Sequence, residues 1–179
     1  MRIAIAAVVV AGAGCAARTS RVELGKATVA GITNFTRVDA TTGCGGSTAP
    51  EAVADLKKMG FASIINLRRE DEPDAEIERE RAAAEGAGLR YIHIPFGFDE
   101  PDPNAKVARF LQEVSQPRNQ PVYIHCHSAN RASAFWMIKR VLLDGWSHDE
   151  ALAEAEMIGL TNARLRAFAE EYVSTHQDE

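Results

Sequence analysis

The stretch PVYIHCHSANRAS, residues Pro121 to Ser133, decides the fold and places the chemistry of this chain. An apolar run ends in His125 and Cys126, a short polar loop follows, and Arg131 opens a segment with helical spacing. Strand, loop and helix in this order bring loop amides and the positive end of a helix dipole to one turn, where they favour an anion. The stretch therefore predicts an oxyanion-binding cradle.

Cys126 and Arg131 supply a nucleophile and a clamp for this cradle. The loop amides, His125 and Arg131 all favour the thiolate form of Cys126, and a guanidinium can bind two oxygens of a tetrahedral anion at once. These are the requirements of covalent catalysis. The alternative is a small buried thiol, a packed imidazole and a surface arginine. The occurrence of Cys126, His125 and Arg131 together at a strand end and a helix start favours the catalytic interpretation.

Strands and helices alternate along the rest of the chain. Apolar runs at residues 61–67, 89–96 and 120–126 predict buried strands, and residues 31–39 predict an edge strand. Helical patterns occupy residues 51–60, 73–88, 102–115, 131–145, 147–159 and a last segment from Asn162. The order predicts one α/β domain over residues 31–175, with a parallel-type central sheet of four to five strands and helices on both faces.

Turn and capping residues mark the boundaries of these elements. Residues 41–50, TTGCGGSTAP, are expected to form a Gly-rich loop, in which Thr48 and Glu51 have the spacing of a capping box. Asp102, which precedes a proline, is the expected N-cap of the next helix. Residues 147–150 carry a second capping-box pattern.

Ligands of parallel sheets bind beyond the carboxyl ends of the strands. The loops expected at that edge are residues 67–70, 96–102 and 126–131. Arg68 is expected to face the ligand site at this edge of the sheet and to help hold an anionic substrate. Arg69 could do so instead, and either arginine could pair with Glu70 or Glu72 on the surface.

Composition excludes several classes of function. The chain has 179 residues and a formal net charge of −5, with 46% hydrophobic and 25% charged residues. Basic residues are spread along the chain, so no nucleic-acid partner is expected. No cluster of His, Cys and Asp has metal-ligand spacing. We therefore expect neither a metal nor a cofactor.

The first residues have the layout of an export signal. Residues 1–17 combine Arg2 with a short apolar run and small residues, and residues 18–30 are expected to be a linker. The sequence GAGC also resembles a lipoprotein processing box, although Gly12 stands where such boxes prefer leucine. Membrane attachment would come only through a lipidated Cys15. We expect an exported protein, periplasmic or lipoprotein-anchored in a bacterium.

An exported chain raises the question of a disulfide. Cys44 and Cys126 could form a structural bridge in an oxidising compartment. Because Cys126 lies in the cradle, we favour a free and reactive thiol, and leave open its oxidation by Cys44.

The segment HCHSANRAS, residues 125–133, resembles the His-Cys-loop-Arg signature of cysteine-dependent protein tyrosine/dual-specificity phosphatases. The order of IINLRRE, YIHIPF and PVYIHC is also similar to that superfamily, and the resemblance runs from about Asn34 to Thr161. Its bacterial branch, also described as β-lactamase-hydrolase-like or as sulfurtransferases, is the most similar. The resemblance implies that Cys126 forms a cysteinyl-phosphate and that Arg131 binds the phosphoryl oxygens.

The loop differs from the phosphatase signature in length. The residues between the thiol and the arginine are His127, Ser128, Ala129 and Asn130. The resemblance implies that their amides bind substrate. Four is also the spacing of rhodanese-type sulfurtransferase loops, whereas the phosphatase signature has five. Ala129 replaces the family's loop glycine, so a positive φ is harder to adopt there. The phosphatase signature has a hydroxyl residue directly after the arginine; here Ala132 stands at that position, and Ser133 follows one place later.

The phosphatase family also uses an acid upstream of the thiol to protonate the leaving group. The segment GFDEPDP supplies Asp99, Glu100 and Asp102. Asp102 is explained as a helix cap, so Asp99 is the predicted acid; a solvated loop carboxylate is the alternative.

Three functions follow. The first is an exported phosphatase that cleaves a phosphate monoester of a phosphorylated protein or a small anionic substrate. The second is a rhodanese-like sulfurtransferase that uses a Cys126 persulfide. The third is an inactive anion-binding pseudophosphatase.

Overall fold

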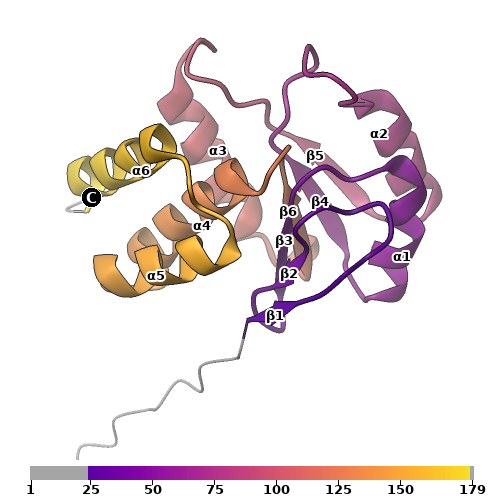
Figure 1. Ribbon diagram of the computed structural model, residues 1–179, viewed down its shortest axis with the longest axis horizontal. Helices are drawn as coiled ribbons and strands as arrows, with labels where there is room; N and C mark the ends of the chain where they lie inside the picture. The colour runs from indigo at the N-terminus through magenta and orange to yellow at the C-terminus, as the bar shows by residue number, and fades with distance from the viewer. Residues whose placement is uncertain (1–23, 178–179) are drawn as a thin grey trace, which may run out of the picture.

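A six-stranded mixed sheet forms the centre of the computed structural model, which describes residues 24–177 (Figure 1). The strands are β1 (Gly25–Lys26), β2 (Thr36–Arg37), β3 (Thr42–Gly45), β4 (Ser63–Asn66), β5 (Arg90–His93) and β6 (Val122–His125). Their order is β1-β2-β3-β6-β4-β5, and β3, β6, β4 and β5 run parallel. The predicted α/β fold is confirmed, and two short antiparallel strands, β1 and β2, extend the parallel sheet at one edge.

Helices cover both faces of this sheet (Figure 1). They are η1 (Pro50–Ala52), α1 (Val53–Lys58), α2 (Ile77–Gly86), α3 (Pro103–Val114), η2 (Pro117–Asn119), α4 (Asn130–Leu142), α5 (His148–Ile158) and α6 (Ala163–His176). Tyr123 of β6 packs in the apolar cluster with α1 and α2, while Val122 and Ile124 pack in the cluster with α3 to α6. This alternation is that of a strand buried on both faces.

Strand β3 replaces part of the Gly-rich loop expected at residues 41–50. Its four residues are buried and pair with β2 and β6. A Cβ on Gly43 would lie 2.6 Å from the Phe61 ring, and one on Gly45 would lie 2.1 Å from the Tyr123 hydroxyl. The expectation of a loop was wrong for residues 42–45, because Gly43 and Gly45 make room for aromatic rings rather than for a turn, and it holds for residues 46–49.

The predicted helix boundaries hold in most places. Ser147 and Glu150 form the predicted capping box, and Asp102 caps α3 by accepting a hydrogen bond from the Ala105 amide. The expected box at Thr48 is absent: η1 precedes α1, neither helix has a side-chain cap, and the Thr48 hydroxyl instead lies 2.9 Å from the hydroxyl of Tyr123.

The N-terminal expectations lie mostly outside the described residues. The export segment 1–17 and Cys15 belong to that part of the chain. Within the segment expected to be a linker, Gly25 and Lys26 form β1, and the Lys26 ammonium donates to the Ile158 carbonyl. None of the helices between residues 24 and 177 has the length and apolarity needed to cross a membrane.

We predict that Gly45→Ala destabilises the protein by at least about 2 kcal/mol, because the new methyl overlaps Tyr123 at the centre of the sheet. Gly86→Ala is the control: Gly86 is exposed in α2, where an added methyl would meet open space, and the change should stabilise by about 0.5–1 kcal/mol. Urea unfolding of both variants measures the difference. Equal effects would contradict the packing role of Gly45.

Candidate active site

Cys126 lies where the central strand of the parallel sheet ends. It follows His125 of β6, which pairs with Gly45 of β3 on one side and Asn66 of β4 on the other. Its side chain is 1% exposed, and α4 begins four residues later at Asn130. The thiol therefore sits between a strand end and a helix N-terminus, as the sequence predicts.

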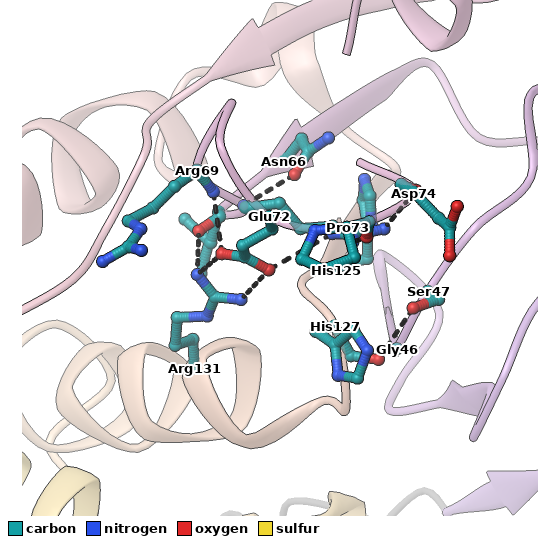
Figure 2. Close-up of polar contacts among 12 residues, drawn as sticks. Gly46, Ser47, Asn66, Arg69, Glu72, Pro73, Asp74, His125, His127 and Arg131 are labelled. Carbon is teal, nitrogen blue, oxygen red and sulfur yellow. Dashed lines mark hydrogen bonds and ion pairs between the residues drawn. The ribbon is translucent and has the colours of Figure 1, made fainter. Parts of the chain in front are cut away.

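The loop after Cys126 is hydrogen-bonded to the turn that follows β3. The His127 carbonyl accepts hydrogen bonds from the Ser47 amide (2.8 Å) and hydroxyl (3.1 Å), as Figure 2 shows. A Cβ on Gly46 would lie 2.9 Å from the same carbonyl. Glycine is thus required at position 46 for the close approach that fixes the loop.

Ala129 adopts a left-handed backbone conformation, although a positive φ was expected to be harder for alanine there. Its φ is +71° and its side chain is fully buried. This conformation costs an alanine about 1 kcal/mol. The α4 helix holds it in place, because the Ser133 amide (2.9 Å) and hydroxyl (2.8 Å) both donate to the Ala129 carbonyl. Ser133 therefore stabilises the loop by hydrogen bonds to its backbone.

The Arg131 side chain extends from the first turn of α4 toward a group of hydrogen-bond acceptors, which we call the socket: the Glu72 carboxylate and the carbonyls of Leu67 and Phe96 (Figure 2). Its Nη1 donates to Oε1 of Glu72 (2.5 Å) and to the carbonyls of Leu67 (2.9 Å) and Phe96 (3.0 Å). Its Nη2 donates to Oε2 of Glu72 at 2.8 Å. The loops after β4 and β5 thus both bind this guanidinium.

Apart from its interaction with Cys126, Arg131 has one edge of its guanidinium without a partner among the described residues, and that edge can bind a ligand. A guanidinium has five N–H donors. Nη1 is fully used and Nη2 keeps one hydrogen, which leaves that hydrogen and the adjacent Nε–H. Two parallel donors on one edge match two oxygens of a phosphate or a similar anion.

The Arg131–Glu72 pair stays charged. Burial alone would raise the pKa of Glu72, but hydrogen bonds from Arg131 and the Arg69 amide, with the charges of Arg131 and Arg68, lower it to about 2. Burial would lower the pKa of Arg131, yet its hydrogen bond to Glu72 and its interaction with Cys126 raise it. Glu72 was not predicted as a site residue, because nothing distinguishes it in the acidic run REDEPDAE.

Arg68, which was expected to face the ligand site, instead points into the protein interior and lines neither cavity beside Arg131. It is 1% exposed, and its guanidinium donates to the carbonyls of Pro73 and Asp74. Arg69 lines the cavity beside Arg131 instead and pairs with Asp99 through Nη1 (2.7 and 2.9 Å). Arg68 therefore shapes the loop that carries Glu72.

The structure brings the predicted acid to the cavity. Asp99 lines a cavity of about 440 Å³ together with Arg131, Arg69 and Glu72. Asp102 is committed to the cap of α3. A second cavity of about 280 Å³ adjoins the first and is lined by Ser128 and Asn130 of the loop, among others. Within residues 24–177, no three His, Cys, Asp or Glu side chains group to hold a metal ion.

A buried polar network lies behind the thiol loop. His125 stacks on Tyr123, and its Nε2 lies 2.9 Å from Oε1 of Glu80 in α2. Oε2 of Glu80 accepts hydrogen bonds from Asn66 (2.8 Å) and the Tyr91 hydroxyl (3.1 Å). The residue predicted to tune the thiolate is therefore fully buried, with its Nε2 close to a carboxylate oxygen but with no hydrogen bond to either ring nitrogen within the described residues.

Cys44 and Cys126 are both free thiols. Cys44 lies within β3, opposite Ile124 of the neighbouring strand, and is completely buried. Burial, reinforced by the charge of Glu154, raises its pKa well above the ordinary value. Cys44 is thus held as a neutral thiol and is a poor nucleophile.

Comparison with known proteins decides the family. A family model, PTP-NADK, described as a DSP-PTPase phosphatase fused to NAD+ kinase, matches residues 23–173. The chain belongs to this phosphatase family. The predicted membership of the cysteine-dependent phosphatase superfamily is confirmed.

Similar proteins include other members of the superfamily. Dual specificity protein phosphatase TpbA of Pseudomonas aeruginosa UCBPP-PA14 is 27% identical over 111 residues, which cover 61% of this chain and 47% of TpbA. The match to TpbA of strain PAO1 is alike, at 27% over 108 residues and 45% of its length. The match therefore spans about half the length of these curated relatives.

Solved structures share the fold of this DSP-PTPase chain. A DUF442 protein from Shewanella putrefaciens CN-32 superposes with a TM-score of 0.67 at 22% identity, covering 82% of this chain and 92% of that one. The catalytic core of the S. cerevisiae PP-IP phosphatase Siw14, in complex with citrate, gives 0.66 at 21% identity, covering 81% and 88%. P. aeruginosa TpbA gives 0.64 at 23%, covering 88% and 92%.

We predict that Glu72→Gln lowers kcat/KM on an aryl phosphate about 10- to 100-fold, because Arg131 loses its charged partner and its free edge shifts. Steady-state kinetics measure the loss. Glu70→Gln, the same change on an exposed neighbour, is the control and should have no effect. Equal activity of the two variants would contradict a positioning role for Glu72.

Glu72 should also make stability depend on pH. Its pKa is about 2 in the folded protein and 4.5 ordinarily, so its contribution is complete above pH 4.5 and is lost as the pH falls toward 2. We expect Glu72→Gln to destabilise by on the order of 2–3 kcal/mol at pH 7 and by much less at pH 3. Denaturant unfolding at both values tests this; a constant difference would contradict it.

Proposed function

We propose that this chain is a cysteine-dependent phosphatase that cleaves a phosphate monoester through a cysteinyl-phosphate intermediate. The placement of Arg131 carries the proposal, because its guanidinium interacts with the Cys126 thiol and its Nε/Nη2 edge has no carboxylate partner among the described residues, so both groups can meet one oxyanion. Cys126 provides the nucleophile at the start of the same loop. Membership of the phosphatase family supports phosphate as that anion.

The first step forms the sulfur–phosphorus bond. The Cys126 thiolate attacks phosphorus in line with the ester oxygen, and the phosphorus–oxygen bond to the leaving group breaks. Arg131 and the amides of residues 127–130 hold the equatorial oxygens, whose charge they stabilise in the transition state. Asp99 in its protonated form donates its proton to the leaving oxygen.

The second step returns the enzyme to its starting state. Water attacks the phosphorus of the cysteinyl-phosphate, the sulfur–phosphorus bond breaks, and the Asp99 carboxylate accepts the proton of that water. The products are inorganic phosphate and the Cys126 thiolate. No cofactor takes part in either step.

Asp99 is the preferred acid on grounds of elimination within the cavity. Of the described residues, Glu72 and Asp99 are the carboxyl groups that line it, and each accepts hydrogen bonds from an arginine through both oxygens. They differ in exposure, because the Glu72 side chain is only 15% exposed. Asp99 is 76% exposed at its side chain and is held over the cavity by Arg69. It can therefore exchange protons with solvent and still reach a leaving group.

The substrate is a phosphorylated protein or a small phosphate ester. A variant of P. aeruginosa TpbA has been crystallised with phosphotyrosine, and Siw14 is a PP-IP phosphatase. These relatives support a phosphoryl substrate for this chain. Both kinds of substrate present the same tetrahedral anion to the loop.

A rhodanese-like sulfurtransferase is the second candidate, and the four-residue loop favours it. In that reaction the thiolate would take the outer sulfur of thiosulfate, releasing sulfite, and would pass it to a thiophilic acceptor such as cyanide. Arg131 would bind the sulfonate oxygens.

We predict that the wild-type chain hydrolyses phenyl phosphate and that Cys126→Ser abolishes turnover. Asp99→Asn should lower kcat about 10²- to 10⁴-fold, because phenolate is a poor leaving group without an acid. Asp102→Asn is the matched control and should retain activity, since asparagine caps helices as well as aspartate. Equal losses at the two positions would remove Asp99 from its role.

Thiosulfate separates the two candidate reactions. Thiocyanate formation from thiosulfate and cyanide, lost in Cys126→Ser and unaccompanied by phosphate release from phenyl phosphate, would establish the sulfurtransferase instead. Mass spectrometry of Cys126 after exposure to each compound identifies the adduct, and only a phosphoryl adduct agrees with the proposed phosphatase.

A further inference from the structure

Arg164 stands beside the catalytic loop without a role in the proposed reaction. It is the second residue of α6, and the Asn162 side chain caps that helix by accepting from the Leu165 amide (3.0 Å). Oδ1 of Asn130 accepts hydrogen bonds from the amides of Thr161 and Asn162, both at 2.7 Å. The start of α6 is therefore fixed to the residue that precedes Arg131.

The guanidinium of Arg164 is oriented but not neutralised. It lies over the Phe98 ring, 3.9 Å from the ring centre. Among residues 24–177, no carboxylate lies within ion-pair distance of it, whereas Arg131 is paired with Glu72 and Arg69 with Asp99. Stacking on an aromatic face restricts the side chain and leaves its N–H edges free to donate.

Arg164 lines both cavities next to the thiol loop. The smaller one is bounded by Phe96, Gly97, Phe98, Ser128, Asn130, Arg131, Asn162, Arg164 and Leu165. Among the residues that the structure describes, two guanidinium groups thus line it and no carboxylate does. On a chain with a net charge of −5, this is a local concentration of positive charge at the site of the chemistry.

We propose that Arg164 forms a subsite for a second anionic group of the substrate, a phosphate or a carboxylate carried near the scissile phosphate. The inference rests on the proposed function, because Arg131 must hold the phosphoryl group that reacts. One guanidinium then binds the reacting anion, and the other selects esters by the charge on their leaving group.

Paired aryl phosphates test this subsite. 4-(Carboxymethyl)phenyl phosphate and its carboxamide analogue differ in one charge and have closely similar leaving groups. We expect the wild type to prefer the carboxylate ester about tenfold in kcat/KM. Arg164→Gln should abolish this preference, lowering kcat/KM for the carboxylate ester about tenfold more than for the amide.

Arg166→Gln provides the matched control. Arg166 lies on the same helix but is paired with Glu170 (2.9 Å) and Glu156 (3.0 Å), and it lines neither cavity. Its replacement removes the same charge and should keep the preference. Equal losses from Arg164→Gln and Arg166→Gln would indicate general electrostatics and would overturn the subsite.

Binding to the Cys126→Ser variant separates this proposal from the proposed function. Calorimetry with the two esters should show the same carboxylate preference and its loss on adding Arg164→Gln. Turnover of neither ester by the wild type would refute the phosphatase, while the binding preference would still support the subsite. Tight binding of both esters without any dependence on Arg164 would exclude the carboxylate as the second anion, and the same result with both the phosphate and the peptide pairs below would overturn the subsite alone.

Two further probe pairs identify the source of the second anion. Propane-1,3-diol bisphosphate against its monophosphate represents small molecules, and Glu–phosphotyrosine–Glu against Gln–phosphotyrosine–Gln represents peptides. A preference that depends on Arg164 in either pair supports the subsite and names its substrate class. No such dependence in any of the three pairs overturns it.

Discussion

The ion pair between Arg131 and Glu72 is the interaction on which the site depends. Arg131 lies in the first turn of α4, and the acceptors of its guanidinium lie in the segments that follow β4 and β5. One side chain therefore connects α4 with these two segments at the carboxyl edge of the sheet. A buried charge is tolerated only when its partners are complete. Here Glu72 and the carbonyls of Leu67 and Phe96 satisfy it on one edge, and the other edge can serve an anion.

The rear of the sheet supports this arrangement by close packing. Glycines of β3 let the rings of Phe61 and Tyr123 lie against the strand, and Gly46 lets the following turn reach the His127 carbonyl. Beneath the loop, His125 is enclosed by Tyr123 and Glu80. The loop from Cys126 to Asn130 therefore has close contacts on its inner side, as expected of a preorganised anion site.

Local patterns were sufficient to predict the parallel strands β4, β5 and β6, most helix caps and the placing of Cys126 and Arg131 on one turn. Those features depend on periodicity and on residues near in sequence. Strand β3 was missed because the need for glycine at positions 43 and 45 arises from rings brought by other strands. Glu72 and the inward turn of Arg68 were missed for the same reason: a carboxylate gains a partner 59 residues away only once the chain is folded. The left-handed Ala129 shows the converse, a local preference overridden by the helix that follows.

The side-chain oxygen of Asn130 has a consequence for the position of the last helix. It accepts both amides at the entrance of α6, so the anion-binding loop and the last helix share one anchor. The position of residue 130 in the loop and the position of the start of α6 are therefore set by one side chain. The last helix, α6, which holds no group that reacts in the proposed mechanism, is thus positioned by a loop residue more than thirty positions earlier in the chain.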